Sequence, residues 1–326
     1  MAAHDATAAA PAIPTAWRTS TLPGALLVFG ALFLLDILID SHALEQGQLT
    51  ELVNSSAALA LAAAGATLVV ISGGFDLSVG AIVSLINVVV ATQLGAASGA
   101  SEPLAIALGI AVGIGAGSVN GFLIGALRLP SVIATLATSF IWSGVALLVL
   151  PTAGAAVEPS FAARYTGTIG NTLPTAALIL AGLLVLWAAF RHTRLGTLVY
   201  AIGSNRESAV ASGSRTGLAT LRIHAAAGFC YGLAGVFLTA RTGSGDPGIG
   251  APMVLNVYTA IAVGGTALGG GRGGLTGSVV GAFTVTIIAN VLFAAGVSSF
   301  YTYICTGLVL VGAVAVNTLR ERSDEH

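Results

Sequence analysis

Apolar runs of about 20 residues recur along this chain, and they constrain its fold more than any other feature. Such a run is the length of helix that crosses the hydrocarbon core of a bilayer. Only 8% of the residues are charged, whereas a soluble domain carries about a quarter, and the mean hydropathy is +0.94. The runs fall at 22–39, 52–71, 81–97, 104–126, 130–150, 173–190, 223–241, 253–268, 275–295 and 299–318. The sequence therefore predicts an all-α polytopic membrane protein with about ten transmembrane helices, and not an outer-membrane barrel of short alternating strands.

The basic residues support this count and give an orientation. All 12 Lys+Arg residues are arginines. If the N-terminus lies in the cytoplasm, only Arg164 and Arg241 fall on the outer side. The others fall inside, as the positive-inside rule requires: Arg18, Arg128, Arg191, Arg194, Arg206, Arg215, Arg222, Arg272, Arg320 and Arg322. We therefore predict that both termini are cytoplasmic.

The same pattern divides the chain. Residues 1–20 read as a flexible cytoplasmic tail, 21–319 as a single transmembrane domain, and 320–326 as a second cytoplasmic tail. The windows 81–97 and 253–268 are short and flanked by glycine or proline, which favours broken or re-entrant helices. Residues 151–172 form the largest expected outer loop.

Glycines recur every fourth residue in the fourth window and form one helix face. Small residues at this spacing let a second helix approach closely. We expect this face to pack against a helix of the same chain rather than to join two subunits. Its members are Gly109, Gly113, Gly117, Gly121 and Gly125.

A polar break follows the second window, with the sequence Ser72-Gly73-Gly74-Phe75-Asp76-Leu77-Ser78-Val79-Gly80. The paired glycines are typical of a helix end, and Asp76 with Ser78 can cap the next helix. The alternative is a break that lines a pathway, because such breaks occur only beside protein or a wet cavity.

A second glycine-rich stretch spans residues 264–274. It lacks the lysine and the following Ser/Thr of a phosphate-binding P-loop, and the whole chain has no lysine. A tight turn with Arg272 on the cytoplasmic side is the better interpretation. We therefore expect no cofactor on this chain; if ATP drives it, ATP and Mg²⁺ bind to another chain.

The longest polar interruption of the C-terminal half runs from Arg191 to Arg222. Within it, Glu207-x-Ala209 and Gly213 fit a short helix that begins after a serine or asparagine cap near Asn205, has an acid in its first turn, and ends at the glycine. From spacing alone, a solvated connector and a docking site for a soluble partner are equally supported.

Other chemistry is not indicated. The five histidines have no metal-ligand spacing, no hydrolytic motif occurs, and a net charge of −1 does not favour nucleic acid as a partner. Asp36, the one acid of the first window, reads as a boundary residue. We expect a protein that is not an enzyme.

Four ordered stretches resemble the membrane permeases of bacterial ABC importers for monosaccharides of the ribose, xylose and galactose type. SGGFDLSVG at 72–80 is similar to the family's GGIDLSVG, and NGFLIGALRLPSVIATLAT at 120–138 to its NG…LxIPxFIxTLGT. AIGSNRESAVASG at 201–213 is similar to AIGxNxEAAxxxG, and AVGGTALGGGRGG at 262–274 to VIGGTSLxGGRG. The resemblance covers about residues 50–318.

The resemblance implies a multi-pass permease of the bacterial inner membrane, surrounded by lipid. Its partners would be an ABC ATPase, a periplasmic or lipid-anchored sugar-binding protein, and a second copy or a homologous permease. ATPase coupling would rest on Asn205, Glu207, Ala209 and Gly213. The translocation path or gate would include Gly73, Gly74, Phe75, Asp76, Ser78, Asn87, Asn120, Asn256, Gly264 and Gly265, the three asparagines being chosen for their polarity within apolar windows.

The chain departs from the family before Gly264. Where the family has GYELDAIA, two acids are replaced, by Val254 and Asn256. Alternatives are a permease for nucleosides or branched-chain amino acids of the same superfamily, or a secondary carrier that uses Asp36 or Asp76 to bind a coupling ion.

Overall fold

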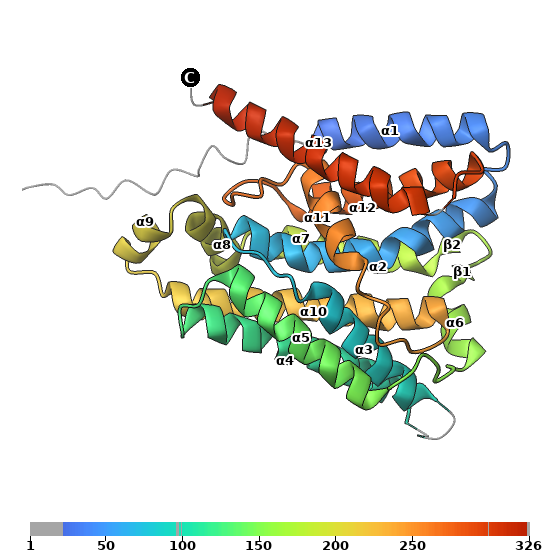
Figure 1. Ribbon diagram of the computed structural model, residues 1–326, viewed down its shortest axis with the longest axis horizontal. Helices are drawn as coiled ribbons and strands as arrows, with labels where there is room; N and C mark the ends of the chain where they lie inside the picture. The colour runs from blue at the N-terminus through green and yellow to red at the C-terminus, as the bar shows by residue number, and fades with distance from the viewer. Residues whose placement is uncertain (1–21, 96–97, 99, 299, 325–326) are drawn as a thin grey trace, which may run out of the picture.

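Thirteen helices and one small hairpin make up the part of the chain that the computed structural model describes, which is residues 22–95, 98, 100–298 and 300–324 (Figure 1). The first helices are α1 (Leu22–Ile39), α2 (Gln46–Ile71), α3 (Val79–Leu94), α4 (Glu102–Gly125), α5 (Ser131–Val149) and α6 (Pro159–Thr166). The hairpin consists of β1 (Thr168–Ile169) and β2 (Leu173–Pro174). The remaining helices are α7 (Thr175–Phe190), α8 (Arg194–Ser204), α9 (Arg206–Ala211), α10 (Thr216–Thr242), α11 (Met253–Val263), α12 (Leu275–Ala294) and α13 (Phe300–Asp324).

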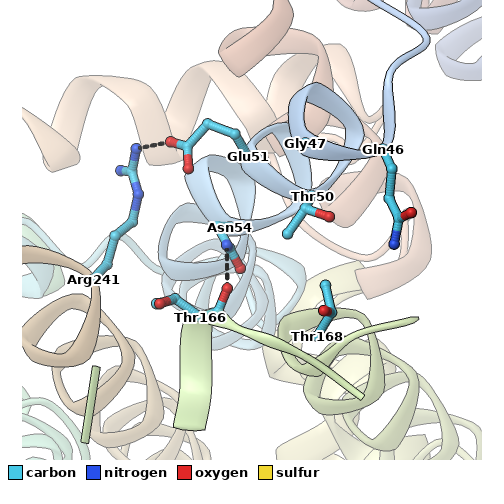
Figure 2. A pocket seen from close by; sticks show the side chains of 8 residues that line it. All are labelled: Gln46, Gly47, Thr50, Glu51, Asn54, Thr166, Thr168 and Arg241. Carbon is cyan, nitrogen blue, oxygen red and sulfur yellow. Dashed lines mark hydrogen bonds and ion pairs between the residues drawn. The ribbon is translucent and has the colours of Figure 1, made fainter. Parts of the chain in front are cut away.

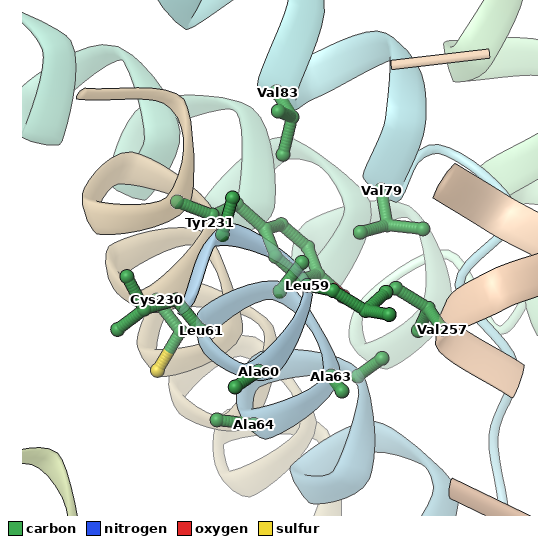
Figure 3. Close-up of a cluster of buried hydrophobic side chains, with 14 of the residues drawn as sticks. Leu59, Ala60, Leu61, Ala63, Ala64, Val79, Val83, Cys230, Tyr231 and Val257 are labelled. Carbon is green, nitrogen blue, oxygen red and sulfur yellow. The ribbon is translucent and has the colours of Figure 1, made fainter. Parts of the chain in front are cut away.

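Helix α2 lies at the centre and is buried along almost its whole length, against α10, α11, α12 and α7. Its middle, residues 57–66, is built from alanine with two leucines and a glycine, so that helices can approach it from every side. At Gly65 an added Cβ would lie 2.7 Å from the carbonyl oxygen of Ala227 and 2.7 Å from the ring of Tyr231. Figure 3 shows these small side chains of α2 beside Cys230 and Tyr231 of α10.

The glycine face of α4 lies inside the molecule. Added Cβ atoms at Gly113, Gly117 and Gly125 would collide with backbone of α10, and at Gly121 one would lie 2.6 Å from the Cα of Leu221. At Gly109 the neighbours are Val90, Ile86 and Val236. The two helices therefore pack backbone to backbone, as small-xxx-small faces do in membranes.

The outer helices carry large exposed apolar side chains, among them Leu38 of α1, Leu148 of α5, Val185 of α7 and Leu308 of α13. A soluble monomer rarely bears so much exposed apolar surface, whereas a bilayer requires it. Within the described part of the chain, six helices are long and apolar enough to cross a membrane: α1, α2, α4, α5, α10 and α12. The prediction of an all-α polytopic membrane protein is thus confirmed in its class.

Each of the ten apolar windows coincides with one helix, namely α1–α5, α7 and α10–α13. Helices α3 and α11 are short, as expected: with 16 and 11 residues they extend about 24 Å and about 16 Å, less than the about 30 Å hydrocarbon core. Helix α7 continues into α8 with a bend of 78°. The window expected at 223–241 starts too late, because α10 begins at Thr216.

The segments outside the windows also have structure. The expected outer loop 151–172 contains α6, whose Phe161 is buried, and β1, whose partner strand β2 begins just after it at Leu173. Helix α13 continues to Asp324, so residues 320–324 of the predicted C-terminal tail are helical. The predicted N-terminal tail, 1–20, lies outside the described residues.

The α4–α10 contact yields a test with a matched control on the same helix. In Gly117→Ala the new methyl group meets the carbonyl oxygen of His224, and overpacking of this kind costs about 1–3 kcal/mol. In Gly115→Ala the methyl group meets nothing within 4 Å, so alanine's better helix propensity should stabilise the protein by at most about 1 kcal/mol. Thermal unfolding followed by fluorescence-detected size exclusion should show a lower Tm for Gly117→Ala only; equal Tm values would contradict the packing.

Candidate translocation and coupling site

The break between α2 and α3 starts with a glycine-terminated helix end. Gly73 has φ +81°, its N–H donates to the carbonyl of Val70, and the N–H of Gly74 donates to that of Val69. These two bonds and the left-handed glycine are the Schellman motif, which the paired glycines predict. The chain therefore turns out of α2 with the last carbonyls paired.

The four residues that follow the glycines have N–H groups outside any helix. Each of them donates to a side-chain oxygen. Phe75 N–H donates to Ser131 Oγ (3.2 Å), Asp76 N–H to Tyr258 Oη (2.7 Å), and Leu77 N–H to Thr135 Oγ1 (3.0 Å). Ser78 N–H donates to Asp76 Oδ1 (3.0 Å). Helices α5 and α11 thus supply acceptors that a lipid environment cannot.

The Asp76 carboxylate is completely buried and accepts from three side chains. The Ser78 hydroxyl donates to Oδ1 (2.5 Å), Asn120 Nδ2 lies 3.5 Å from the same oxygen, and the Tyr231 hydroxyl donates to Oδ2 (3.2 Å). Asn120 also donates to Ser78 Oγ (2.7 Å) and accepts from Thr138 Oγ1 (2.7 Å). We call these six side chains the Asp76 cluster: Asp76, Ser78, Asn120, Thr138, Tyr231 and Tyr258.

The predicted joint capping of α3 by Asp76 and Ser78 is therefore wrong for Ser78. Its side chain makes no cap bond to α3, because the hydroxyl is engaged by Asp76 and Asn120. Asp76 does accept an N–H, that of Ser78 just before α3. A buried carboxylate is costly unless it is hydrogen-bonded, which explains why the capping groups are drawn into the cluster.

The other residues predicted for the path do not join this cluster. Asn87 is buried farther along α3, where Nδ2 donates to Thr239 Oγ1 (2.9 Å) and Oδ1 accepts from Asp246 N–H (2.7 Å), so it fixes the loop after α10. Asn256 is half-buried on α11 and is not among the partners of Asp76. Gly264 packs against Gly277 of α12, and Gly265 (φ +78°) ends α11. The ring of Phe75 lies 5.5 Å from that of Tyr258.

The predicted short helix between Asn205 and Gly213 is present as α9, Arg206–Ala211. Asn205 caps it, with Oδ1 accepting from Ser208 N–H (2.8 Å). Gly213 (φ +78°) ends it in a second Schellman motif, because its N–H donates to Val210 and that of Ser214 to Ala209. The spacing between Asn205 and Gly213 is thus explained by their positions at the start and the end of α9.

The side chains of α9 divide into two faces. Ala209 is buried against Ile202 of α8 and Ala219 of α10. Glu207 is exposed. Helix α8 was not predicted; Thr193 caps it by accepting from Gly196 N–H (3.1 Å), and its apolar face carries Gly196, Val199 and Ile202. The Glu207 carboxylate therefore lies at the surface, on a helix whose opposite face packs against α8 and α10.

A cavity of about 650 Å³, which we call the inner cavity, lies between the break and α9. One wall carries Ser72, Gly73 and Gly74 of the break, and another carries Arg206 and Val210 of α9. The remaining lining comes from the α4–α5 loop and the start of α10, including Arg128, Ser131, Thr220 and His224. The structure thus brings two of the predicted motifs to the same cavity.

The same segments also touch directly. Gly203, near the end of α8, is so close to the carbonyl of Ile71 that an added Cβ would overlap it, and the Cβ would lie 2.6 Å from Gly271 N. The N–H of Gly271 donates to Ile71 O (2.8 Å). The end of α2, the end of α8 and the glycine-rich stretch 264–274 therefore form one backbone contact, which only glycine at these positions permits.

Several residues that bond to the break or to the Asp76 cluster were missed from the sequence. In the sequence, Tyr231 and Tyr258 are simply aromatic residues within apolar windows, and no local pattern connects them with residue 76. Ser131, Thr135 and Thr138 do carry a signal, because spacings of four and three residues place the three hydroxyls on one face of α5. A polar stripe inside an apolar helix is the pattern that identifies them.

A helical bundle with a broken central segment, a buried polar cluster and an amphipathic pair on one face has the architecture of a membrane transport protein. Over residues 48–314 the chain matches the family described as the permease component of branched-chain amino acid transport systems. The chain therefore belongs to this permease family, and it is a multi-pass protein of the bacterial inner membrane. Permease components are transporter subunits rather than enzymes.

Among curated proteins, the chain is similar to the ribose import permease protein RbsC of Bacillus subtilis, with 36% identity over 296 residues, 89% of this chain and 91% of the relative. It is 30% identical to the galactose/methyl galactoside import permease protein MglC of Escherichia coli, over 91% of this chain and 94% of the relative. It is also 30% identical to the fructose import permease protein FrcC of Rhizobium meliloti, over 82% and 77%. No solved structure matches the chain.

The Asp76 cluster can be tested at its edge. Thr138→Val keeps the shape of the side chain but leaves Asn120 Oδ1 without its donor, which costs about 1–3 kcal/mol for a buried acceptor. Ser139→Ala, on the adjacent half-buried position, removes only a hydroxyl that donates to the Leu136 carbonyl of its own helix, so it should destabilise the protein less than Thr138→Val does. The measurement is the thermal unfolding midpoint in detergent, and a Thr138→Val protein as stable as the Ser139→Ala protein would contradict the cluster.

Proposed function

We propose that this chain is the transmembrane permease subunit of an ATP-driven ABC importer and provides the translocation path for a monosaccharide. A pentose, hexose or furanose delivered by a binding protein is the substrate. The observation that carries this proposal is the inner cavity, which has the polar break between α2 and α3 on one wall and α9 on the other. Family membership supports the permease role. The names of the three relatives above, which are ribose, galactose and fructose import permeases, support the substrate class.

In this proposal α9 is the coupling helix. Glu207 engages a cleft of the ATPase, while Ala209 and Gly213 keep the helix seated on α8 and α10. ATP-driven closure of two ATPases moves two such helices. Because Gly203 contacts Ile71, that movement reaches the break and tilts the permease between inward- and outward-open states.

The proposal places ten spans in the membrane with both termini in the cytoplasm. Support comes from the arginines whose side chains are described. Those in the segment with α8 and α9, in the α4–α5 loop and in the glycine-rich stretch lie at one end: Arg128, Arg191, Arg194, Arg206, Arg215, Arg222 and Arg272. Arg164 and Arg241 lie at the other end, where α6 meets the end of α10. The α9 end is then the cytoplasmic one.

The same reasoning gives the partners. The chain has no lysine for a Walker A motif, so ATP and Mg²⁺ bind to a separate ATPase. Each chain carries one α9, whereas two ATPases offer two clefts, so two permeases form the assembly, either two copies or a homologous pair. The binding protein docks on the opposite face.

Charge reversal at the coupling helix tests the proposal. In Glu207→Arg, ATP-dependent sugar uptake and stimulation of the ATPase should be lost while the permease still inserts, because the carboxylate is exposed and has no ion-pair partner among the described residues. Glu158→Arg, an exposed reversal beside α6 at the other end, should leave ATPase assembly unchanged. Copurification of the ATPase and its ATP turnover are the readouts; full stimulation in Glu207→Arg would overturn the role of α9.

The energy source separates this proposal from an ion-coupled carrier. In proteoliposomes that contain ATP, collapse of the proton gradient should leave uptake running, because transport is driven by the ATPase. Immediate loss of uptake would instead support a carrier. Thermal-shift screening of the cognate binding protein with ribose, galactose, fructose, nucleosides and branched-chain amino acids assigns the substrate; stabilisation by nucleosides or amino acids alone would contradict a sugar.

A further inference from the structure

At the end of the molecule opposite α9, a cavity of about 560 Å³ opens between the start of α2, the segment from α6 to β1, and the end of α10 (Figure 2). We call it the outer pocket. Its volume falls within the about 300–1,000 Å³ range of small-molecule sites. Its lining residues are Gln46, Gly47, Thr50, Glu51, Asn54, Thr166, Thr168 and Arg241. All of them except Gly47 carry a side chain that can form hydrogen bonds.

Asn54 supplies an unused acceptor in this pocket. The residue is only 4% exposed, and its Nδ2 donates to the carbonyl oxygen of Thr166 (2.8 Å). Because that carbonyl can only accept, the amide nitrogen must face it, and the orientation of the side chain is fixed. Asn54 Oδ1 is then buried and, among the described residues, has no hydrogen-bond partner. The pocket therefore calls for a ligand group that donates.

The charged groups of the pocket balance each other. Arg241 Nη2 lies 2.8 Å from Glu51 Oε1 and 2.9 Å from Ser55 Oγ, and Ser55 Oγ also donates to Glu51 Oε1 (2.8 Å). Figure 2 shows this ion pair on the wall of the pocket, with Thr50 and Thr168 across the opening. A carboxylate bound to a guanidinium leaves no net charge to attract an ion, but both groups keep lone pairs and N–H bonds for a neutral polar ligand.

We propose that the outer pocket binds a neutral polyhydroxyl molecule of monosaccharide size, as the first site that the solute occupies on this chain. One hydroxyl group donates to Asn54 Oδ1, a second hydroxyl donates to Glu51, and a hydroxyl oxygen accepts from Arg241. Neighbouring hydroxyls reach Thr50 and Thr168. The inference rests on the proposed function, because the solute is the imported sugar, and it adds a site that lies apart from the inner cavity and the Asp76 cluster.

The test is direct binding of D-ribose, D-galactose and D-fructose to the full chain in lipid nanodiscs, measured by saturation-transfer-difference NMR. Wild type should give saturable transfer to at least one sugar. Glu51→Gln and Thr168→Val should each raise the Kd about five-fold or more, because each loses one hydrogen bond to the ligand. Asn54→Leu should do so more strongly. Thr172→Val, an exposed threonine of the same hairpin outside the pocket, should bind as wild type does.

Three results would overturn the proposal. The first is absence of transfer from all three sugars in wild type, and the second is equal Kd values in wild type and the pocket variants. The third is variants that bind sugar normally but lose affinity for the binding protein, which would make this face a protein-docking surface. Since Glu51 and Thr168 lie at the rim, their variants remain informative where Asn54→Leu does not fold.

A parallel uptake assay separates this inference from the proposed function. With the ATPase and the binding protein present, the pocket variants should transport with a raised KM and no loss of ATP-driven turnover at saturation. If wild type shows no ATP-dependent sugar uptake, the proposed function fails. If wild type transports sugar and the pocket variants have its KM, the proposed function stands and the outer pocket is not a sugar site.

Discussion

The structure depends on one constraint: a chain that breaks its helix inside an apolar molecule must pair every backbone N–H and C=O that the break frees. Between α2 and α3, protein groups accept from every N–H of residues 73–78. The Schellman motif at Gly73 pairs the carbonyls of Val69 and Val70, and side chains of α5, α11 and Asp76 accept from the four N–H groups of residues 75–78. The positions of α5, α10 and α11 around α2 follow from the need to deliver these groups.

Glycine is the second element of the design, and it serves three distinct purposes. It ends helices at Gly73, Gly213 and Gly265, where a positive φ is needed. It lets α4 and α10 pack backbone to backbone along the stripe that includes Gly117. At Gly203 it brings the end of α8 against the end of α2. In the proposed importer, an ATPase that moves α9 would therefore act on the break through backbone contact rather than through long side chains.

Much of this could be predicted from the sequence, because its signals are local. Apolar length locates the ten apolar helices, and paired glycines or the cap at Asn205 locate helix ends. The Asp76 cluster could be predicted only in part. Tyr231 and Tyr258 lie more than 150 residues from Asp76, and no periodicity in one chain reports such a contact. Asn87 shows the converse case: polarity within an apolar window locates a buried amide, but the sequence does not reveal that its oxygen accepts from the loop after α10. Its place in the path stays a prediction.

The outer pocket escaped prediction for the same reason. Glu51 and Asn54 are ordinary polar residues near the start of a long apolar helix, and Arg241 reads as a topology residue. Only the fold brings them together, 190 residues apart in sequence for the Glu51–Arg241 pair. An amide whose oxygen has no partner is likewise a property of the packed structure and not of the sequence.

The central claim is that α9 transmits movement of an ATPase to the α2–α3 break across the inner cavity. Spin labels at Ala211, at the end of α9, and Leu127, on the α4–α5 loop, report the width of that cavity, once Cys230 and Cys305 are replaced by serine. In the complete transporter the account predicts that ATP shifts the distance distribution, and that Glu207→Arg abolishes the shift. A distribution that ATP leaves unchanged, in a preparation that imports its solute, would contradict it.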